Sequence, residues 1–137
     1  MSVRRLRGES GQGLPEAAII LPLLTFLLLA MVSFVVVLNT KVAVTSAARE
    51  AARCYAVYQD TSRAKEVAEQ NLRDAVMGYA GGCRVAIQQS GGYVTVTVTY
   101  DQPTLVPGLF RILGADTSAW GTTVTLSSAA VFRIEPR

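Results

Sequence analysis

Histidine is absent from this sequence, and cysteine, charged residues and aromatic residues are scarce. The 137 residues include two cysteines, and 17% of the chain is charged while 7% is aromatic. Without histidine the chain lacks the commonest general base and the commonest metal ligand, and two cysteines alone do not make a zinc site. These shortages argue against a hydrolase or a metalloenzyme. We therefore expect no enzymatic activity and no metal or other cofactor.

Two kinds of binding site are also disfavoured. The glycine pairs at residues 81–82 and 91–92 lack the lysine and the serine or threonine of a phosphate-binding loop. Residues 63–74 carry charges of both signs in an interspersed order, as on the solvated face of a helix. We expect no nucleic-acid partner, because such a partner requires a basic patch.

The long apolar stretch at residues 17–38 is the most informative feature of the chain. Half of all residues are hydrophobic, and this stretch has no charge and only Thr25 and Ser33 as polar side chains. At about 1.5 Å per residue a helix of this length crosses a bilayer core of roughly 30 Å. We predict a membrane span. The alternative, a helix buried inside a soluble protein, needs more apolar surface than the rest of the chain offers.

The flanks of this stretch predict its orientation. Arg4, Arg5 and Arg7 precede it, so the positive-inside rule places the N-terminus in the cytoplasm and exports the C-terminal part. A cleavable secretory signal has a shorter apolar region, typically about 7 to 15 residues. We therefore expect the span to be retained.

Two residues near the start of the span are candidates for function. Glu16 adjoins the apolar stretch, where an isolated buried carboxylate costs several kcal/mol and must find water, a cation or a proton. A position at the lipid headgroups, favoured by the helix dipole, is the simpler interpretation. Pro22 removes one helical hydrogen bond and predicts a kink near Ala18, either tolerated or used as a hinge.

Residues 8–16, GESGQGLPE, followed by the apolar stretch resemble a prepilin leader, and the likeness is closest to the TadE-like branch of pilin-related proteins. This branch belongs to the tight-adherence (Flp-type) pilus system. Three further stretches fit the same family: AAREAAR at residues 47–53, TLVPG at 104–108 and LSSAAVFRIEP at 126–136. The resemblance implies that a prepilin peptidase cuts between Gly11 and Gln12, which makes Glu16 the fifth residue of the mature chain.

The resemblance also implies a function through assembly. The chain would sit in the bacterial inner membrane and, after processing, join a pilus used for adhesion. Its partners would be the prepilin peptidase, other pilins of the system, the inner-membrane assembly platform and the lipid bilayer. The new amine of Gln12 would pair with a Glu16 carboxylate and set the axial register. Two alternatives remain: an uncleaved, permanently anchored subunit of the same apparatus, and a pseudopilin of a type II secretion system.

Periodicity predicts the fold beyond the span. Val44, Ala48, Ala51, Tyr55 and Tyr58 recur at helical spacing, which indicates that the span continues as a helical stem. Residues 60–62 are good cap residues for a second helix, and the glycines at 81–82 are expected to stop it. Alternation in residues 85–87, 93–100 and 123–135 predicts a three-stranded antiparallel sheet packed on both helices.

We therefore predict an α+β, pilin-like fold in four parts. These are a leader (residues 1–11), a transmembrane and assembly helix (12–38), a helical stem (39–59) and an exported headgroup (60–137). Within the second part, we call residues 17–38 the apolar segment. The stem is residues 39–59, and the headgroup is residues 60–137. The apolar linker at residues 101–121 is expected to fold over the sheet edge, to touch the bilayer or to meet another subunit.

Cys54 and Cys83 would both lie in an oxidising compartment, where we expect them to form a disulfide. Closing a loop of about 30 residues contributes on the order of 3 to 4 kcal/mol in the chain-entropy model. A pair of buried free thiols is the alternative.

Overall fold

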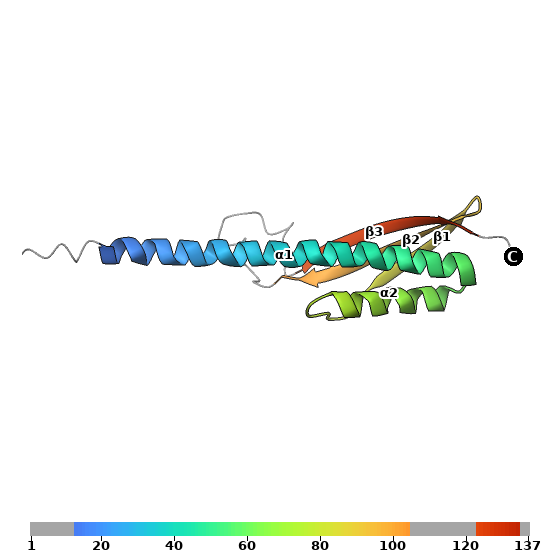
Figure 1. Ribbon diagram of the computed structural model, residues 1–137, viewed down its shortest axis with the longest axis horizontal. Helices are drawn as coiled ribbons and strands as arrows, with labels where there is room; N and C mark the ends of the chain where they lie inside the picture. The colour runs from blue at the N-terminus through green and yellow to red at the C-terminus, as the bar shows by residue number, and fades with distance from the viewer. Residues whose placement is uncertain (1–12, 105–122, 135–137) are drawn as a thin grey trace, which may run out of the picture. The chain divides into compact units, whose positions relative to one another are not determined.

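The structure is a computed structural model that describes residues 13–104 and 123–134 (Figure 1). Along the chain it has the helices α1 (Gly13–Tyr58) and α2 (Thr61–Ala75), then the strands β1 (Arg84–Ser90), β2 (Tyr93–Pro103) and β3 (Thr123–Arg133). A long N-terminal apolar helix, a second helix and a three-stranded antiparallel sheet confirm the predicted α+β fold. The predicted cleavage point between Gly11 and Gln12 and most of the apolar linker lie outside the described residues.

Helix α1 continues from the apolar segment into the stem without interruption, as the sequence predicted. The described chain divides into two compact units that meet within this helix, between Val32 and Ser33. Pro22 is accommodated inside α1, and the kink expected near Ala18 stays a prediction. The hydroxyl of Thr25 donates to the carbonyl of Leu21 at 2.9 Å, so this polar side chain is satisfied within the helix itself.

The chain reverses direction between α1 and α2. Gln59 adopts a left-handed backbone with φ of 54°, and Asp60 caps the new helix. The Asp60 carboxylate accepts hydrogen bonds from the backbone N–H groups of Ser62 at 2.8 Å and Arg63 at 3.3 Å. These bonds satisfy donors that the first turn of a helix otherwise leaves without partners. The cap region predicted at residues 60–62 is therefore confirmed.

Helix α2 ends at Ala75, earlier than the glycine pair at residues 81–82 where we expected it to stop. Val76 takes an extended backbone conformation, and its N–H still donates to the carbonyl of Leu72 at 2.9 Å. The Val76 side chain is buried in the core. The prediction was wrong because the β-branched Val76 is better placed in the core with an extended backbone than at another helical position.

Two stacked tyrosines hold the segment that follows α2. The rings of Tyr79 and Tyr100 lie 5.4 Å apart between centroids and 14° from parallel, and the Tyr100 hydroxyl accepts a hydrogen bond from the Ala80 N–H at 3.3 Å. Tyr100 is fully buried in β2. The ring stacking and the hydrogen bond both attach the segment between α2 and β1 to β2, the central strand of the sheet.

Strand β2 lies between β1 and β3, and both neighbours pair with it in antiparallel register. Alternate residues of β2 point toward the helices and are buried: Val94, Val96, Val98, Tyr100 and Gln102. The threonines between them are half-buried on the opposite face. The alternation of valine and threonine thus predicted correctly which face of the sheet is covered.

A single core joins the stem, α2 and the sheet. The stem contributes Val44 and Tyr55 together with small residues: Ala43, Ala47, Ala48, Ala51, Ala52 and Ala56. These alanines allow the sheet and α2 to approach the stem closely. Tyr58 was expected on the same face, but half of it is exposed, and Arg63 lies 4.4 Å over its ring. The expectation was wrong because Tyr58 is the last residue of α1 and lies outside the core, where its ring contacts Arg63 instead.

Candidate functional site

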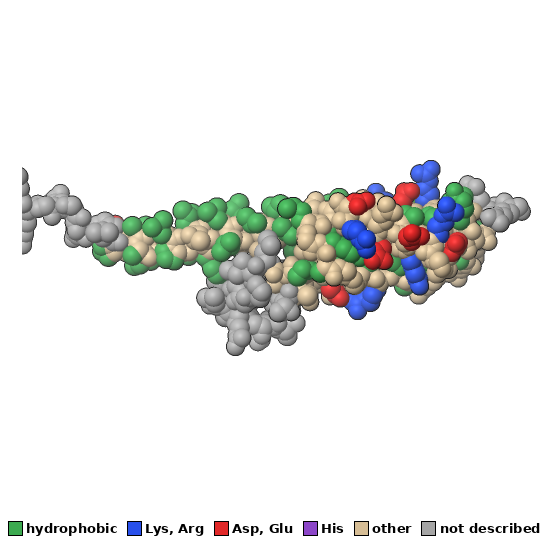
Figure 2. All heavy atoms as spheres, turned by 90° about the horizontal axis from the view of Figure 1, so that it is seen from below, with side chains coloured by type: hydrophobic (Ala, Val, Ile, Leu, Met, Phe, Trp, Pro, Cys, Tyr) green, Lys and Arg blue, Asp and Glu red, His purple; other side chains and the backbone are tan. Residues whose placement is uncertain are grey.

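Most of the apolar segment is exposed. Its exposed large hydrophobic side chains range from 42% exposed at Leu29 to 73% at Ile19, whereas Phe26, Val36 and Val37 are half-buried. The most apolar 18-residue window of α1 has a mean hydropathy of 2.8, and none of it is buried. Figure 2 shows hydrophobic side chains along this part of α1, whereas charged side chains gather over the headgroup. Within the described residues the segment is therefore not the core helix of a soluble domain, and it fits a single-pass membrane protein.

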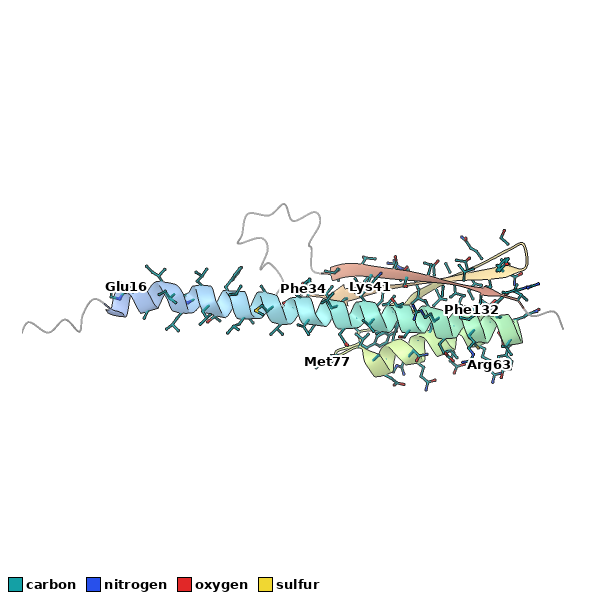
Figure 3. The ribbon with its side chains drawn as sticks, turned by 45° about the horizontal axis from the view of Figure 1, so that its top comes forward. Glu16, Phe34, Lys41, Arg63, Met77 and Phe132 are labelled. Carbon is teal, nitrogen blue, oxygen red and sulfur yellow. The ribbon has the colours of Figure 1, made fainter. Side chains whose placement is uncertain are left out.

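Glu16 lies in the first turn of α1 and is exposed (Figure 3). A carboxylate in this position is favoured by the helix dipole and by the free backbone N–H groups of the first turn. The structure thus places Glu16 at the N-terminal border of the apolar segment. Its predicted partner, the amine of Gln12, lies outside the described residues, so the pairing stays a prediction.

Three consecutive polar residues lie at the other border of the apolar segment, and we call them the polar junction: Asn39, Thr40 and Lys41. Successive residues of an α-helix point about 100° apart, so three in a row reach three sides of the helix. Each side chain bonds a different element of the headgroup: the end of α2, the end of β2 and the middle of β3. The headgroup is therefore attached to the stem at the level where the apolar segment ends.

The central bond of the polar junction is buried. The Thr40 hydroxyl lies 3.0 Å from Oε1 of Gln102 and 2.9 Å from the carbonyl oxygen of Val36, so its single proton serves two acceptors. Thr40 is 1% exposed and Gln102 is 3% exposed. The Gln102 Nε2 atom donates to the carbonyl of Pro103 at 3.2 Å. Because buried polar groups are costly when they lack a partner, this pair favours one register between stem and sheet.

Lys41 covers part of the open edge of β3. The Ile134 N–H donates a hydrogen bond to the Gly92 carbonyl at 2.9 Å. In this register the backbone N–H and C=O groups of even-numbered β3 residues point toward β2. Odd-numbered carbonyls of β3 therefore face away from the sheet. One of them, that of Ser127, accepts a hydrogen bond from the Lys41 ammonium group. A lysine at an open edge hinders pairing with a further strand.

Sequence reasoning missed the polar junction. It assigned no role to Asn39, Thr40 or Lys41. The available signal was the run of three polar residues directly after the apolar segment. Their partners could not be inferred, because they lie between 36 and 86 positions away along the chain.

Both cysteines are free thiols in the structure, and both are half-buried. The expected bridge between Cys54 and Cys83 is therefore not formed in it. Cys83 lies directly before β1 and lines a shallow depression with Lys65 and Glu69 of α2. Burial raises the pKa of the Cys83 thiol, and the nearby Glu69 carboxylate raises it further. Both effects disfavour the thiolate, which is the form that reacts.

The part of the chain that the structure describes contains no group of three or more metal-ligating side chains. Two acidic residues form ion pairs with arginines. Arg84 bonds Asp101 at 2.8 Å, and Arg73 lies 3.5 Å from Glu69 on the surface of α2. Exposed pairs of this kind contribute little to stability.

We expect Thr40→Val to lower the free energy of unfolding by about 1 to 3 kcal/mol, because Gln102 loses a buried partner. The measurement is chemical denaturation of the full chain in detergent micelles. Thr45→Val is the matched control, because the Thr45 hydroxyl bonds only the Lys41 carbonyl of its own helix among the bonds described. The double variant Thr40→Val/Gln102→Leu should recover part of the loss. Equal stability of both single variants would contradict the role of the junction.

In a Cys54→Ser background we expect Cys83 to react slowly with iodoacetamide and its rate to rise with pH up to and beyond 9. Glu69→Gln should speed the reaction, because removing the negative charge lowers the pKa of the thiol. Glu66→Gln on the same helix is the control and should leave the rate unchanged. Reaction rates are measured by mass spectrometry of timed samples. Identical rates in all three chains would show that Glu69 does not act on Cys83.

Comparison with known families gives a match for the N-terminal region of the chain. The family model of TadE-like proteins, a family associated with the Tad pilus, matches residues 11–53. The match takes in Gly11, Glu16, the apolar segment, the polar junction and part of the stem. It confirms the resemblance inferred from sequence over these residues, while the similar stretches at 104–108 and 126–136 lie beyond it. No curated protein and no solved structure matches the chain at a significant level.

Proposed function

We propose that this chain is a minor pilin or pseudopilin of a Tad (Flp-type) pilus system, anchored in the bacterial inner membrane with a cytoplasmic N-terminus. A prepilin peptidase cuts it between Gly11 and Gln12, and the mature chain then enters the pilus or the complex that initiates it. The match of residues 11–53 to the TadE-like family is the observation that carries this proposal. The exposed apolar segment, which needs a non-aqueous environment, supports it.

The apolar segment serves two successive environments in this proposal. In the membrane its side chains contact lipid, and in the pilus they contact the apolar helices of neighbouring subunits. Lipid tails are as apolar as leucine, so the hydrophobic effect gives little preference for the bundle over the bilayer. The preference must come from close packing and from polar contacts. A carboxylate such as Glu16 at the border of the segment can supply one of these contacts.

Pairing between Glu16 and the mature amine of Gln12 is the polar contact that we propose. It neutralises both charges as the helix enters a medium of low dielectric constant, where an unpaired charge is costly. Since both groups lie at the same end of the helix, the pair also sets how far one subunit is displaced along the next. The pair can form within one chain or between neighbours with the same effect on charge.

The polar junction supports a mechanical role for the stem. Bonds from Asn39, Thr40 and Lys41 connect α1 to three headgroup elements at one level. An axial displacement of α1 is therefore transmitted to α2 and to the sheet at the same time. This arrangement suits a subunit that is lifted from the membrane together with its headgroup.

Processing is tested by intact-mass analysis of the chain expressed with the peptidase of its own system. We expect the mature mass to lack residues 1–11, and we expect Gly11→Val to abolish the cut. Gly8→Ala and Gly13→Ala are the controls and should still be processed at the same bond. A full-length mass in the wild-type chain would favour the uncleaved anchor instead, whereas co-purification with type II secretion components would favour that system.

Assembly is tested by Glu16→Ala. We expect normal membrane insertion but incorporation into pili reduced about tenfold or more, which corresponds to the loss of roughly 1.4 kcal/mol. Thr25→Val is the control within the same segment, because the Thr25 hydroxyl is already bonded to the Leu21 carbonyl. Incorporation is measured by immunoblotting of sheared pili against membrane fractions. Wild-type incorporation of Glu16→Ala would exclude this role for Glu16.

A further inference from the structure

Met77 is the most exposed large hydrophobic residue in the described part of the chain. It is 78% exposed and lies in the segment that follows α2. Its neighbours behave differently, since Val76 is buried and Tyr79 packs against the core. A single exposed apolar side chain is ordinary on a protein surface. The position of Met77 relative to the apolar segment is what gives it significance.

The direction of α2 brings Met77 to the end of the headgroup nearest the apolar segment. After the reversal at Gln59, α2 runs back along the stem, antiparallel to it (Figure 1). It ends at Ala75, whose carbonyl accepts a hydrogen bond from Asn39 Nδ2 at 3.3 Å. Asn39 is the first polar residue after the apolar segment, so α2 ends level with that border. Met77, two residues further on, lies at this end (Figure 3).

The surface of α1 at this level also carries exposed apolar side chains, beside the exposed Asn39 and Lys41. Phe34 and Val35 are each 63% exposed, and Val42 is 66% exposed, all within the same compact unit as Met77. The one cation of α1 at this level, Lys41, is turned to the Ser127 carbonyl of β3. In Figure 3 Met77 and Lys41 lie at one end of the headgroup, while Arg63 and Phe132 lie toward the other.

We propose that the segment around Met77 is a second point of contact with the membrane, where the Met77 side chain enters the interfacial region of the bilayer that holds α1. The proposal rests on the membrane placement of the apolar segment in the proposed function. Methionine suits this position because it is unbranched and flexible and adapts to an irregular apolar surrounding. Asp74, three residues before Met77, is exposed, so its carboxylate stays in water and limits the depth of insertion.

A second contact point has a consequence for the orientation of the headgroup. A single helix leaves a protein free to rotate and tilt at the membrane surface, whereas an additional contact beside the helix restricts both motions. The contact must break when the subunit leaves the bilayer. One exposed methionine gives a contact weak enough to be reversible.

Depth-dependent fluorescence quenching tests the proposal in the full chain. Trp120→Phe removes the one native tryptophan, and Met77→Trp, Leu28→Trp or Tyr93→Trp then introduces a single probe. Each chain is placed in phosphatidylcholine and phosphatidylglycerol nanodiscs, one copy per disc, with bromine at a shallow or a deep acyl position. Leu28 lies within the apolar segment and is 55% exposed, whereas Tyr93 begins β2 at the opposite end of the headgroup and is 52% exposed.

We expect Met77→Trp to be quenched at least twofold by shallow bromine, Leu28→Trp to be quenched most by deep bromine, and Tyr93→Trp to be unaffected. Quenching at Leu28→Trp without quenching at Met77→Trp would overturn the inference and leave the membrane placement intact. Loss of quenching at Leu28→Trp would overturn both. Shielding of Met77→Trp only in discs that hold two copies would identify a second subunit as the partner and refute lipid contact.

A second measurement needs no substitution. The chain has three methionines, Met1, Met31 and Met77, and labelling their methyl groups with ¹³C gives separate probes. A lipid-soluble paramagnetic agent should broaden Met77 as well as Met31, which lies in the apolar segment and is 60% exposed. A water-soluble agent should leave Met31 sharp. Broadening of Met77 only by the water-soluble agent would contradict lipid contact.

Discussion

The structure depends on one constraint: a helix that is apolar on every side cannot be covered by the small domain attached to it. Helix α1 meets this constraint by having two kinds of surface along its length. The apolar segment is mostly exposed, while the stem buries a row of alanines against α2 and the sheet. The uncovered part must be surrounded by lipid or by other apolar helices, since water is an unfavourable solvent for so much apolar surface. The proposed membrane anchoring and the proposed assembly into a pilus both follow from that need.

The change from one surface to the other takes place within a few residues. Asn39, Thr40 and Lys41 bond three different elements of the headgroup, and the buried pair of Thr40 and Gln102 makes one alignment of stem and sheet better than its alternatives. The same arrangement brings the end of α2 to the border of the apolar segment. In the proposed membrane placement, the position of this border therefore decides which headgroup residues can contact the bilayer.

Local patterns in the sequence predicted much of the fold correctly. Alternating valine and threonine indicated which face of β2 is buried, and Asp60 marked the start of α2, because periodicity and capping depend only on neighbouring residues. The end of α2 and the exposure of Tyr58 were not predicted correctly, and a bridge between Cys54 and Cys83 stays a prediction. Val76 packs in the core instead of continuing the helix, and Tyr58 contacts Arg63 instead of the core. Both outcomes depend on residues brought together by folding.

The sequence by itself determined that a long apolar helix begins beside Glu16 and carries an α+β headgroup, because hydrophobicity and its period are properties of contiguous residues. It also contained the resemblance that the family match confirms over residues 11–53. Only the tertiary structure decided which groups the polar junction bonds, which edge of the sheet Lys41 covers and at what level Met77 lies. These features join residues far apart in the chain, and their positions are set by the packing of α2 and the sheet on the stem.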